Sequence, residues 1–120
     1  MKKIYSLKTC NSCQRILKAL NLPADFKLQD IKKINISSED LDTLKALSGS
    51  YEALFNKRAK LYKEMGLKNK ILQESDYRHY ILNHYTFLKR PVLVLGDQVF
   101  IGNSSKTTAA AKLALTNSIC

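Results

Sequence analysis

The sequence predicts an α/β fold with a small mixed sheet whose strands come from both ends of the chain. Three observations predict this fold. The first thirty residues change from a strand pattern to a helical pattern and back, the middle of the chain has helical periodicity, and the last third returns to strands before a final helix. A chain of 120 residues can build one ordinary core but not two, so a single domain over 1–120 is expected.

The N-terminal segment has the pattern of a strand, a helix and a second strand. Residues 2–7 are typical of a short strand, and a helical pattern begins at Asn11 or Ser12 and stops at Asn21. Apolar and polar residues alternate again over 26–30. A short helix between two strands is typical of a crossover that joins parallel strands.

The middle of the chain is predicted to be helical. Ser37 caps a helix that Gly49 ends, with an acidic residue three positions after the cap as in a capping box. Short helical turns are expected over 51–55 and 61–65. Ser75 is the expected cap of one more helix.

The C-terminal third predicts a hairpin and a helix. The apolar run 91–95 is typical of a buried central strand, residues 96–97 predict a tight turn, and 98–101 predict the second strand. Ser104 or Ser105 then caps the last helix. The order β-α-β, helices, β-β-α is that of a thioredoxin-like fold with a helical insertion over roughly residues 37–85.

Composition limits the kinds of function. Lysine and arginine outnumber acidic residues by 20 to 10, which attracts anionic partners, and part of this charge lies within 57–70, where a solvated helix face explains it most simply. No nucleic-acid-binding module, signal peptide or apolar run of roughly 18 residues is present. We therefore expect a cytoplasmic protein with reduced thiols and no direct binding to nucleic acid or membrane.

The sharpest local motif is Cys10-Asn11-Ser12-Cys13, which follows a predicted strand and begins a predicted helix. The free N–H groups and positive end of a helix stabilise a thiolate, so the pKa of Cys10 should be lowered, with Lys8 and Arg15 as nearby cations. A second cysteine one turn later can attack an adduct on the first. This arrangement is typical of a redox-active dithiol.

Two other interpretations of this motif stay open. The cysteines could be half of a zinc site completed by His79 and His84, although the intervening segment is far longer than in a compact zinc finger. They could also be inert structural cysteines. We expect no metal, with the two histidines as surface or packing residues of a helix.

Arg90-Pro91 is the second motif. A proline can begin a strand because the first residue need not donate to the ladder, and about 5–6% of X–Pro bonds are cis. The planar guanidinium of Arg90 suits an oxyanion such as arsenate, phosphate or a carboxylate, and a solvated strand end is the simpler alternative. Cys120 is either a third reactive thiol or a frayed terminal residue.

Three blocks of sequence occur in order along the chain: Ile4 to Cys10 at the first strand and loop, Phe55 to Leu67 in the helical middle, and Leu88 to Val94, followed by Phe100 to Asn103. With these blocks the chain resembles the ArsC/Spx family over nearly its whole length. That family of thioredoxin-like proteins includes glutaredoxin-dependent arsenate reductases, YffB-type thiol reductases and the Spx transcription regulators.

The resemblance implies roles for particular residues. Cys10 matches the catalytic cysteine, Arg90 the arginine before a cis-proline, Pro91 that proline, and Arg58 the arginine of the N-T-R segment. The chain departs from the arsenate reductases in having Cys13, and in having Asn56 and Gly102 or Asn103 where further arginines are expected. The residues expected to bind the substrate or its anionic group are Asn11, Ser12, Arg58, Arg90 and Pro91.

Two functional hypotheses follow from the resemblance. The first is a thiol-dependent oxidoreductase, in which the Cys10 thiolate attacks a small oxyanion or thiol adduct and glutathione with glutaredoxin, or thioredoxin, supplies electrons. The second is an Spx-like regulator that binds the RNA polymerase α subunit under control of a Cys10–Cys13 disulfide. We expect the enzyme, as a monomer with no bound cofactor.

Overall fold

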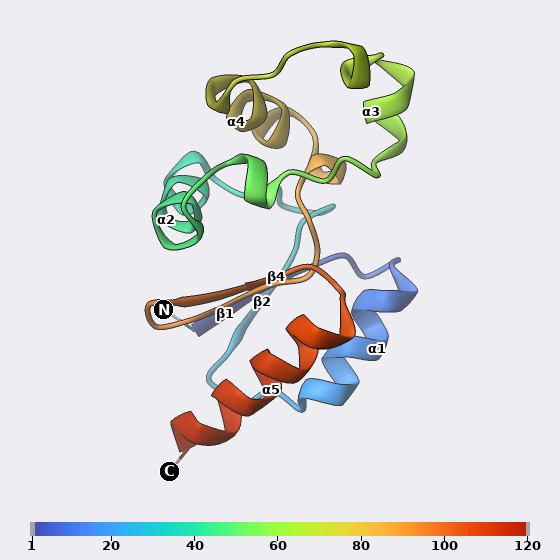
Figure 1. Ribbon diagram of the computed structural model, residues 1–120. Coiled ribbons are helices and arrows are strands. Elements are labelled where there is room, and N and C mark those ends of the chain that lie inside the picture. The colour runs from blue at the N-terminus through green and yellow to red at the C-terminus, as the bar shows by residue number, and fades with distance from the viewer. Residues whose placement is uncertain (1, 120) are drawn as a thin grey trace. The chain divides into compact units, whose positions relative to one another are not determined.

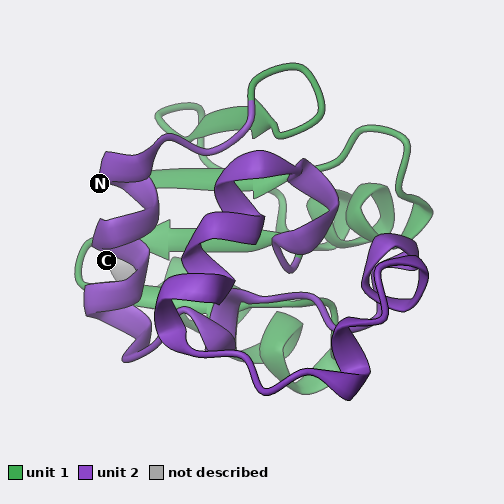
Figure 2. Cartoon of the chain, turned by 90° about the horizontal axis from the view of Figure 1, so that it is seen from above, with its two compact units in different colours: residues 1–34, 90–120 green, residues 35–89 purple. Residues whose placement is uncertain are grey.

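The computed structural model describes residues 2–119, with side chains as far as residue 117 (Figure 1). The chain divides into two compact units (Figure 2). Residues 1–34 together with 90–120 form the first unit, and residues 35–89 form the second. Cys120 lies outside the described residues, so its role stays a prediction.

The first unit contains the mixed sheet that the sequence predicts. Its strands are β1 (Lys2–Ser6), β2 (Lys27–Asp30), β3 (Val92–Leu95) and β4 (Gln98–Ile101). They lie in the order β2-β1-β3-β4, with β1 parallel to β2 and the other neighbouring pairs antiparallel (Figure 1). All four residues of β3 are buried, as its continuous apolar run predicts.

Two helices cover one face of this sheet (Figure 1). They are α1 (Asn11–Leu20), which makes the crossover between the parallel strands, and α5 (Ser105–Ile119). Because side chains alternate across a strand, only every second residue of β1 and β3 reaches these helices. The buried cluster between sheet and helices consists of Ile4, Ile16, Leu20, Leu93, Leu95, Ala111 and Leu115.

Local hydrogen bonds fix the ends of both helices. The α1 helix stops at Asn21, which has the left-handed φ of 48° that asparagine tolerates, and the Asn21 N–H donates to the Leu17 carbonyl at 3.3 Å. At the start of α5 the Ser104 hydroxyl accepts from the Thr107 N–H at 3.1 Å. Ser104, rather than Ser105, is therefore the cap.

The second unit is helical, as predicted. Three short 3₁₀ turns accompany its three α-helices. In chain order the elements are α2 (Ser38–Ser48), η1 (Glu52–Leu54), α3 (Lys60–Glu64), η2 (Leu67–Asn69), α4 (Glu74–Asn83) and η3 (Tyr85–Phe87).

One of the two predicted helix caps of this unit is confirmed, and the other is wrong. Ser37 is confirmed, because its hydroxyl accepts from the Asp40 N–H at 3.1 Å. Ser75 is wrong as a cap, since α4 already begins at Glu74. The Asp76 carboxylate accepts from the Gln73 N–H at 2.8 Å, which fixes the helix start earlier and leaves Ser75 exposed in the first turn.

Phe55 organises the core of the second unit. Its ring centroid lies 4.9 Å from that of Tyr77, 5.2 Å from that of Phe87 and 5.9 Å from that of Tyr62. Tilted and offset arrangements of this kind add to the stabilisation from burial. A backbone bridge between Phe55 and Leu88 holds the same region together.

An ion pair links α2 to α4 in this unit. The Arg78 guanidinium donates two hydrogen bonds to the Asp42 carboxylate, at 2.9 Å and 3.2 Å, and the Tyr51 hydroxyl donates a third at 2.6 Å. Hydrogen bonding from Arg78 first, and then from Tyr51, lowers the pKa of Asp42 from 3.8 to about 2.

Within residues 2–119, no helix combines the length and the apolar character needed to cross a membrane.

We expect Leu93→Ala to destabilise the fold, because Leu93 is only 2% exposed and belongs to the cluster under α1 and α5. The loss in the free energy of unfolding should be about 2–5 kcal/mol, measured by urea denaturation. Leu113→Ala is the matched control, since Leu113 is 63% exposed. Equal losses in the two variants would contradict this account of the core.

We expect the ion pair of Asp42 to stabilise the protein only above the pKa of the carboxyl group. The folded pKa of about 2 lies below the ordinary 3.8, so this contribution is present above about pH 4 and is lost as the pH falls towards 2. Asp42→Asn should lower Tm near neutral pH, and the difference from the unchanged protein should disappear near pH 2. The exposed Glu39 on the same helix supplies the control, Glu39→Gln, for which the difference should be smaller.

Candidate active site at the start of α1

Cys10 stands at the junction of the β1–α1 loop and the helix. Its N–H donates to the Leu7 carbonyl at 3.0 Å, and its own carbonyl accepts the first helical hydrogen bond from the Gln14 N–H at 3.1 Å. The Gln14 side-chain amide also donates to the Lys8 carbonyl at 3.0 Å. These three bonds hold the loop and place the half-buried Cys10 at the N-terminal end of α1.

Cys13 lies one turn further along α1 and is fully buried. It belongs to the buried stripe of the helix, with Ile16 and Leu20, that packs on the sheet. The CxxC spacing therefore directs the two thiols differently, because one stands at the accessible helix end and the other on the helix face that meets the core.

Several groups act on the pKa of Cys10. Burial raises it, but hydrogen bonds from the Cys13 backbone N–H and thiol, together with the Arg90 guanidinium, outweigh burial and lower it below the usual 9.0. Cys10 is therefore the thiol that ionises first and the stronger candidate for a nucleophile. The cation beside it is Arg90, from a distant part of the chain.

The pKa of Cys13 moves in the opposite direction. Burial raises it first, and the neighbouring Cys10 sulfur raises it further, while the Leu7 N–H and the nearby Ser6 hydroxyl partly oppose this by favouring the thiolate. A more acidic thiol at Cys10 and a less acidic thiol at Cys13 are the properties expected of an attacking and a resolving cysteine.

Sheet topology explains why Arg90 meets Cys10. Because β1 and β3 are antiparallel, with Tyr5 opposite Val92, the chain that leaves β1 and the chain that enters β3 lie at the same end of the sheet. The peptide bond between Arg90 and Pro91 is cis, and the Pro91 carbonyl accepts from the Gly102 N–H at 2.9 Å.

One nitrogen of the Arg90 guanidinium forms no hydrogen bond with the described residues. Its Nη1 is buried and has no hydrogen-bond partner among the described residues. Buried N–H groups are rarely left unpaired, and a guanidinium is built to bind carboxylate-like or phosphate-like oxygens. Arg90 is therefore the candidate anion-binding group beside Cys10.

The structure places the remaining predicted residues as follows. Asn11 and Ser12 are the first residues of α1, where backbone N–H groups lack acceptors within the helix. Pro91 is buried in the same unit. Arg58 belongs to the second unit, on an exposed turn where its N–H donates to the Asn56 side-chain oxygen at 3.0 Å. Its role at the site stays a prediction.

The described residues offer no set of ligands for a zinc site at the CxxC motif. Among the described residues, no group of three or more His, Cys, Asp or Glu side chains could hold a metal ion. His79 is exposed on α4 and contacts Asn83, and His84 Nδ1 lies 2.8 Å from the Thr86 hydroxyl oxygen.

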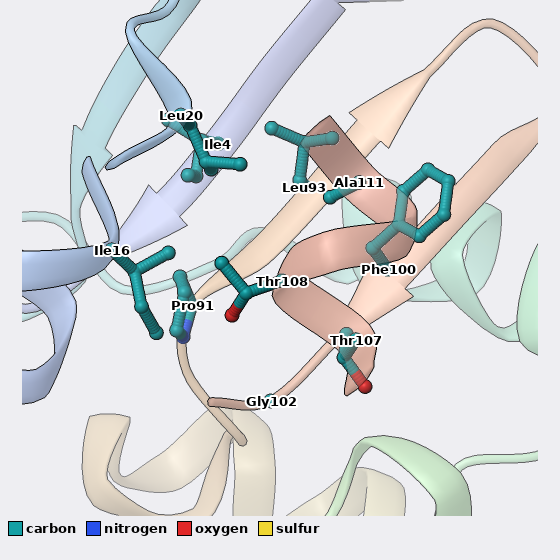
Figure 3. Close-up of a pocket in the computed structure, with 10 residues that line it drawn as sticks. All are labelled: Ile4, Ile16, Leu20, Pro91, Leu93, Phe100, Gly102, Thr107, Thr108 and Ala111. Atoms are coloured by element: carbon teal, nitrogen blue, oxygen red, sulfur yellow. The ribbon is translucent and has the colours of Figure 1, made fainter. Parts of the chain in front are cut away.

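A cavity lies nearby in the first unit, between the sheet and its helices. Ile16, Pro91 and Thr108 are among the side chains that line it (Figure 3). Its volume is about 10 Å³, which is room for about one water molecule. Neither cysteine is among the side chains that line it, and a volume of this size has no room for a substrate larger than water.

Sequence analysis missed one residue beside the thiols, namely Ser6. It is 2% exposed, and it ends β1 close to Cys13. The available signal was its position two residues after Ile4, because residues i and i+2 of a strand share a face.

Comparison with known proteins agrees with this description. The β-α-β and β-β-α elements around one sheet are those of a thioredoxin-like protein. A family model described as "ArsC family" matches residues 5–111, so the chain belongs to the ArsC family. A comparison with curated protein sequences found no match.

Solved structures share the fold over most of their length. The YFFB protein is 23% identical, with a TM-score of 0.76 over 92% of this chain and 98% of its own. An arsenate reductase from Vibrio cholerae is 20% identical, with a TM-score of 0.76 over 95% and 96%. A chain described as a possible arsenate reductase from Streptococcus mutans UA159 is 26% identical, with a TM-score of 0.69 over 88% and 92%.

We expect Arg90→Gln to raise the pKa of Cys10, because it removes the cation that stabilises the thiolate. The measurement is the rate of Cys10 alkylation by iodoacetamide as a function of pH. Arg15→Gln on the exposed face of α1 is the matched control, with a smaller expected effect. If Arg15→Gln moved the profile as far as Arg90→Gln, the assignment of Arg90 as the partner of Cys10 would be wrong.

Proposed function

We propose that this protein is a thiol-dependent reductase in which the Cys10 thiolate attacks an oxidised, anionic substrate. One observation carries the proposal: Arg90 stabilises the Cys10 thiolate while its buried Nη1 has no partner among the described residues. A nucleophile and an unused anion-binding group thus come together at one helix end. Membership of the ArsC family supports the same conclusion.

Arsenate is the substrate to test first. The structures from Vibrio cholerae and Streptococcus mutans are described as arsenate reductases, the second as a possible one. Arsenate is a small oxyanion, and Arg90 with the free N–H groups at the start of α1 suits such an anion. The family resemblance also implies an anion-binding role for Arg58, and that role stays a prediction.

The proposed reaction has two steps. In the first, the Cys10 sulfur forms a bond to arsenic, and an arsenate oxygen leaves as water after taking up protons. In the second, another thiolate attacks the Cys10 sulfur, and the S–As bond breaks with its electron pair passing to arsenic. Arsenic is thereby reduced from As(V) to As(III), and two thiols are oxidised to one disulfide.

Cys13 is the proposed source of the second thiolate. It lies one helical turn from Cys10, and its raised pKa favours the protonated thiol before the second step. Glutathione with glutaredoxin, or thioredoxin, would then reduce the Cys10–Cys13 disulfide and restore the dithiol. These electron donors, the monomeric state and the cytoplasmic location remain predictions from the sequence.

We expect arsenate-dependent NADPH oxidation when the protein is mixed with glutathione, glutaredoxin and glutathione reductase. Cys10→Ser should abolish it, because a hydroxyl at this position cannot form the sulfur–arsenic bond. Cys13→Ser should slow it and leave an adduct on Cys10 that mass spectrometry detects. Ser75→Ala, on an exposed turn of α4, should behave as the unchanged protein. Turnover that persists in Cys10→Ser would overturn the proposal.

A second candidate function follows from the closeness of the two thiols. Cys10 and Cys13 are both free, and each affects the pKa of the other, so a disulfide could form without any substrate. An Spx-like regulator would use that disulfide to control binding to the RNA polymerase α subunit. Absence of binding in both the oxidised and the reduced state would remove this candidate.

A further inference from the structure

Ser6 has an unusual environment for a buried serine. It is 2% exposed, and its Oγ has no hydrogen-bond partner among the described residues, a situation shared there only by Arg90 Nη1. Its backbone carbonyl is used normally, as the acceptor of the Ile31 N–H at 2.9 Å. A buried hydroxyl without a partner destabilises the fold, so this side chain calls for an explanation.

Strand and helix geometry direct the Ser6 side chain towards Cys13. Ser6 lies on the same face of β1 as Ile4, two residues earlier, and Ile4 packs against Ile16 and Leu20 of α1. Cys13 belongs to that same buried stripe of α1, at its N-terminal end. The last residue of the strand and the first buried residue of the helix therefore face each other.

Two potential hydrogen-bond donors lie near the Cys13 sulfur. The Leu7 N–H and the Ser6 hydroxyl both favour the thiolate form, against burial and the neighbouring Cys10 sulfur. The titratable and charged groups around Cys13 are Cys10, at the start of the same helix, and Arg90, from the segment that enters β3 and acts on Cys10.

We propose that the Ser6 hydroxyl is a preformed hydrogen-bond donor that stabilises the Cys13 thiolate when Cys13 attacks an adduct on Cys10. The proposal rests on the proposed function, because it assigns Cys13 the resolving role. It explains why a hydroxyl is buried without a partner in the dithiol state: its partner is the charge that appears only during the reaction.

The step can be written for a small disulfide, RS–SR. The Cys10 thiolate attacks one sulfur, forms a Cys10–SR bond and releases one RS⁻. The Cys13 thiol gives its proton to solvent, and the resulting thiolate attacks the Cys10 sulfur. The Cys10–SR bond breaks, the Cys10–Cys13 bond forms and a second RS⁻ leaves, so two thiols are oxidised and one disulfide is reduced.

Direct titration of Cys13 tests the hydrogen bond without any reductase activity. In a Cys10→Ala, Cys120→Ser background, the ultraviolet absorbance of the thiolate reports Cys13 alone. Ser6→Ala should move the titration midpoint to higher pH, and Ser6→Thr, which keeps a hydroxyl, should restore it. Equal midpoints with and without Ser6→Ala would overturn the proposal. A threonine variant that titrates like the alanine variant would assign the effect to packing and overturn it as well.

The resolving step can be timed with dithiobis(nitrobenzoate), which releases a coloured thiolate once for each attack. In the Cys120→Ser protein, Ser6→Ala should leave the first release unchanged and slow the second by about tenfold, as expected for a lost hydrogen bond to a charged group. Ser75→Ala should slow neither release. Equal rates of the second release in Ser6→Ala and the unchanged protein would overturn the proposal.

Thermal stability separates this role from a structural one. Removing an unpaired buried hydroxyl should leave Tm equal or higher, so a slow second release in a stable Ser6→Ala protein supports the proposal. A fall in Tm would show that Ser6 serves the fold instead and would contradict the proposal. The proposed reductase fails separately, if arsenate turnover persists in Cys10→Ser.

Discussion

The contact between the Cys10 sulfur and the Arg90 guanidinium is the interaction on which the site depends. It joins the start of α1 to the start of β3, and the antiparallel pairing of β1 with β3 makes the two meet. The helix end alone offers partial charges, whereas Arg90 adds a full positive charge that a neutral side chain could not replace. The reactivity of the Cys10 thiol therefore depends both on the position of α1 and on the pairing of β1 with β3.

Much of the fold could be predicted from the sequence because the patterns that determine it are local. The apolar run of β3, the Ser37 cap and the stop at Asn21 each depend on a few neighbouring residues. The prediction for Ser75 is wrong because a serine in a first helical turn has the same local pattern as a cap. There the side chain of Asp76 binds back to the Gln73 N–H instead, and this bond sets the boundary.

The candidate site was predictable in part for the same reason. Cys10 and Cys13 form a local motif, and their placement at a helix start follows from the strand before them. The pairing of Cys10 with Arg90 depends on the register of β1 and β3, which local patterns do not contain. The Arg90-Pro91 motif indicated an anion-binding arginine, but it did not show that this arginine lies beside Cys10. Ser6 escaped notice because an unpaired hydroxyl is recognisable only once every neighbouring donor and acceptor is placed.

The complete burial of Cys13 has a consequence for oxidative damage. Peroxide reacts with accessible thiolates, so Cys10 is the sulfur that becomes a sulfenic acid first. Further oxidation to sulfinic acid is irreversible for most proteins, but condensation with a nearby thiol diverts the sulfenic acid into a reducible disulfide. Because Cys13 is shielded from the oxidant and lies one turn away, it stays available as the thiol that condenses with the Cys10 sulfenic acid. The dithiol can therefore be recovered after an exposure to oxidant that would inactivate a lone cysteine.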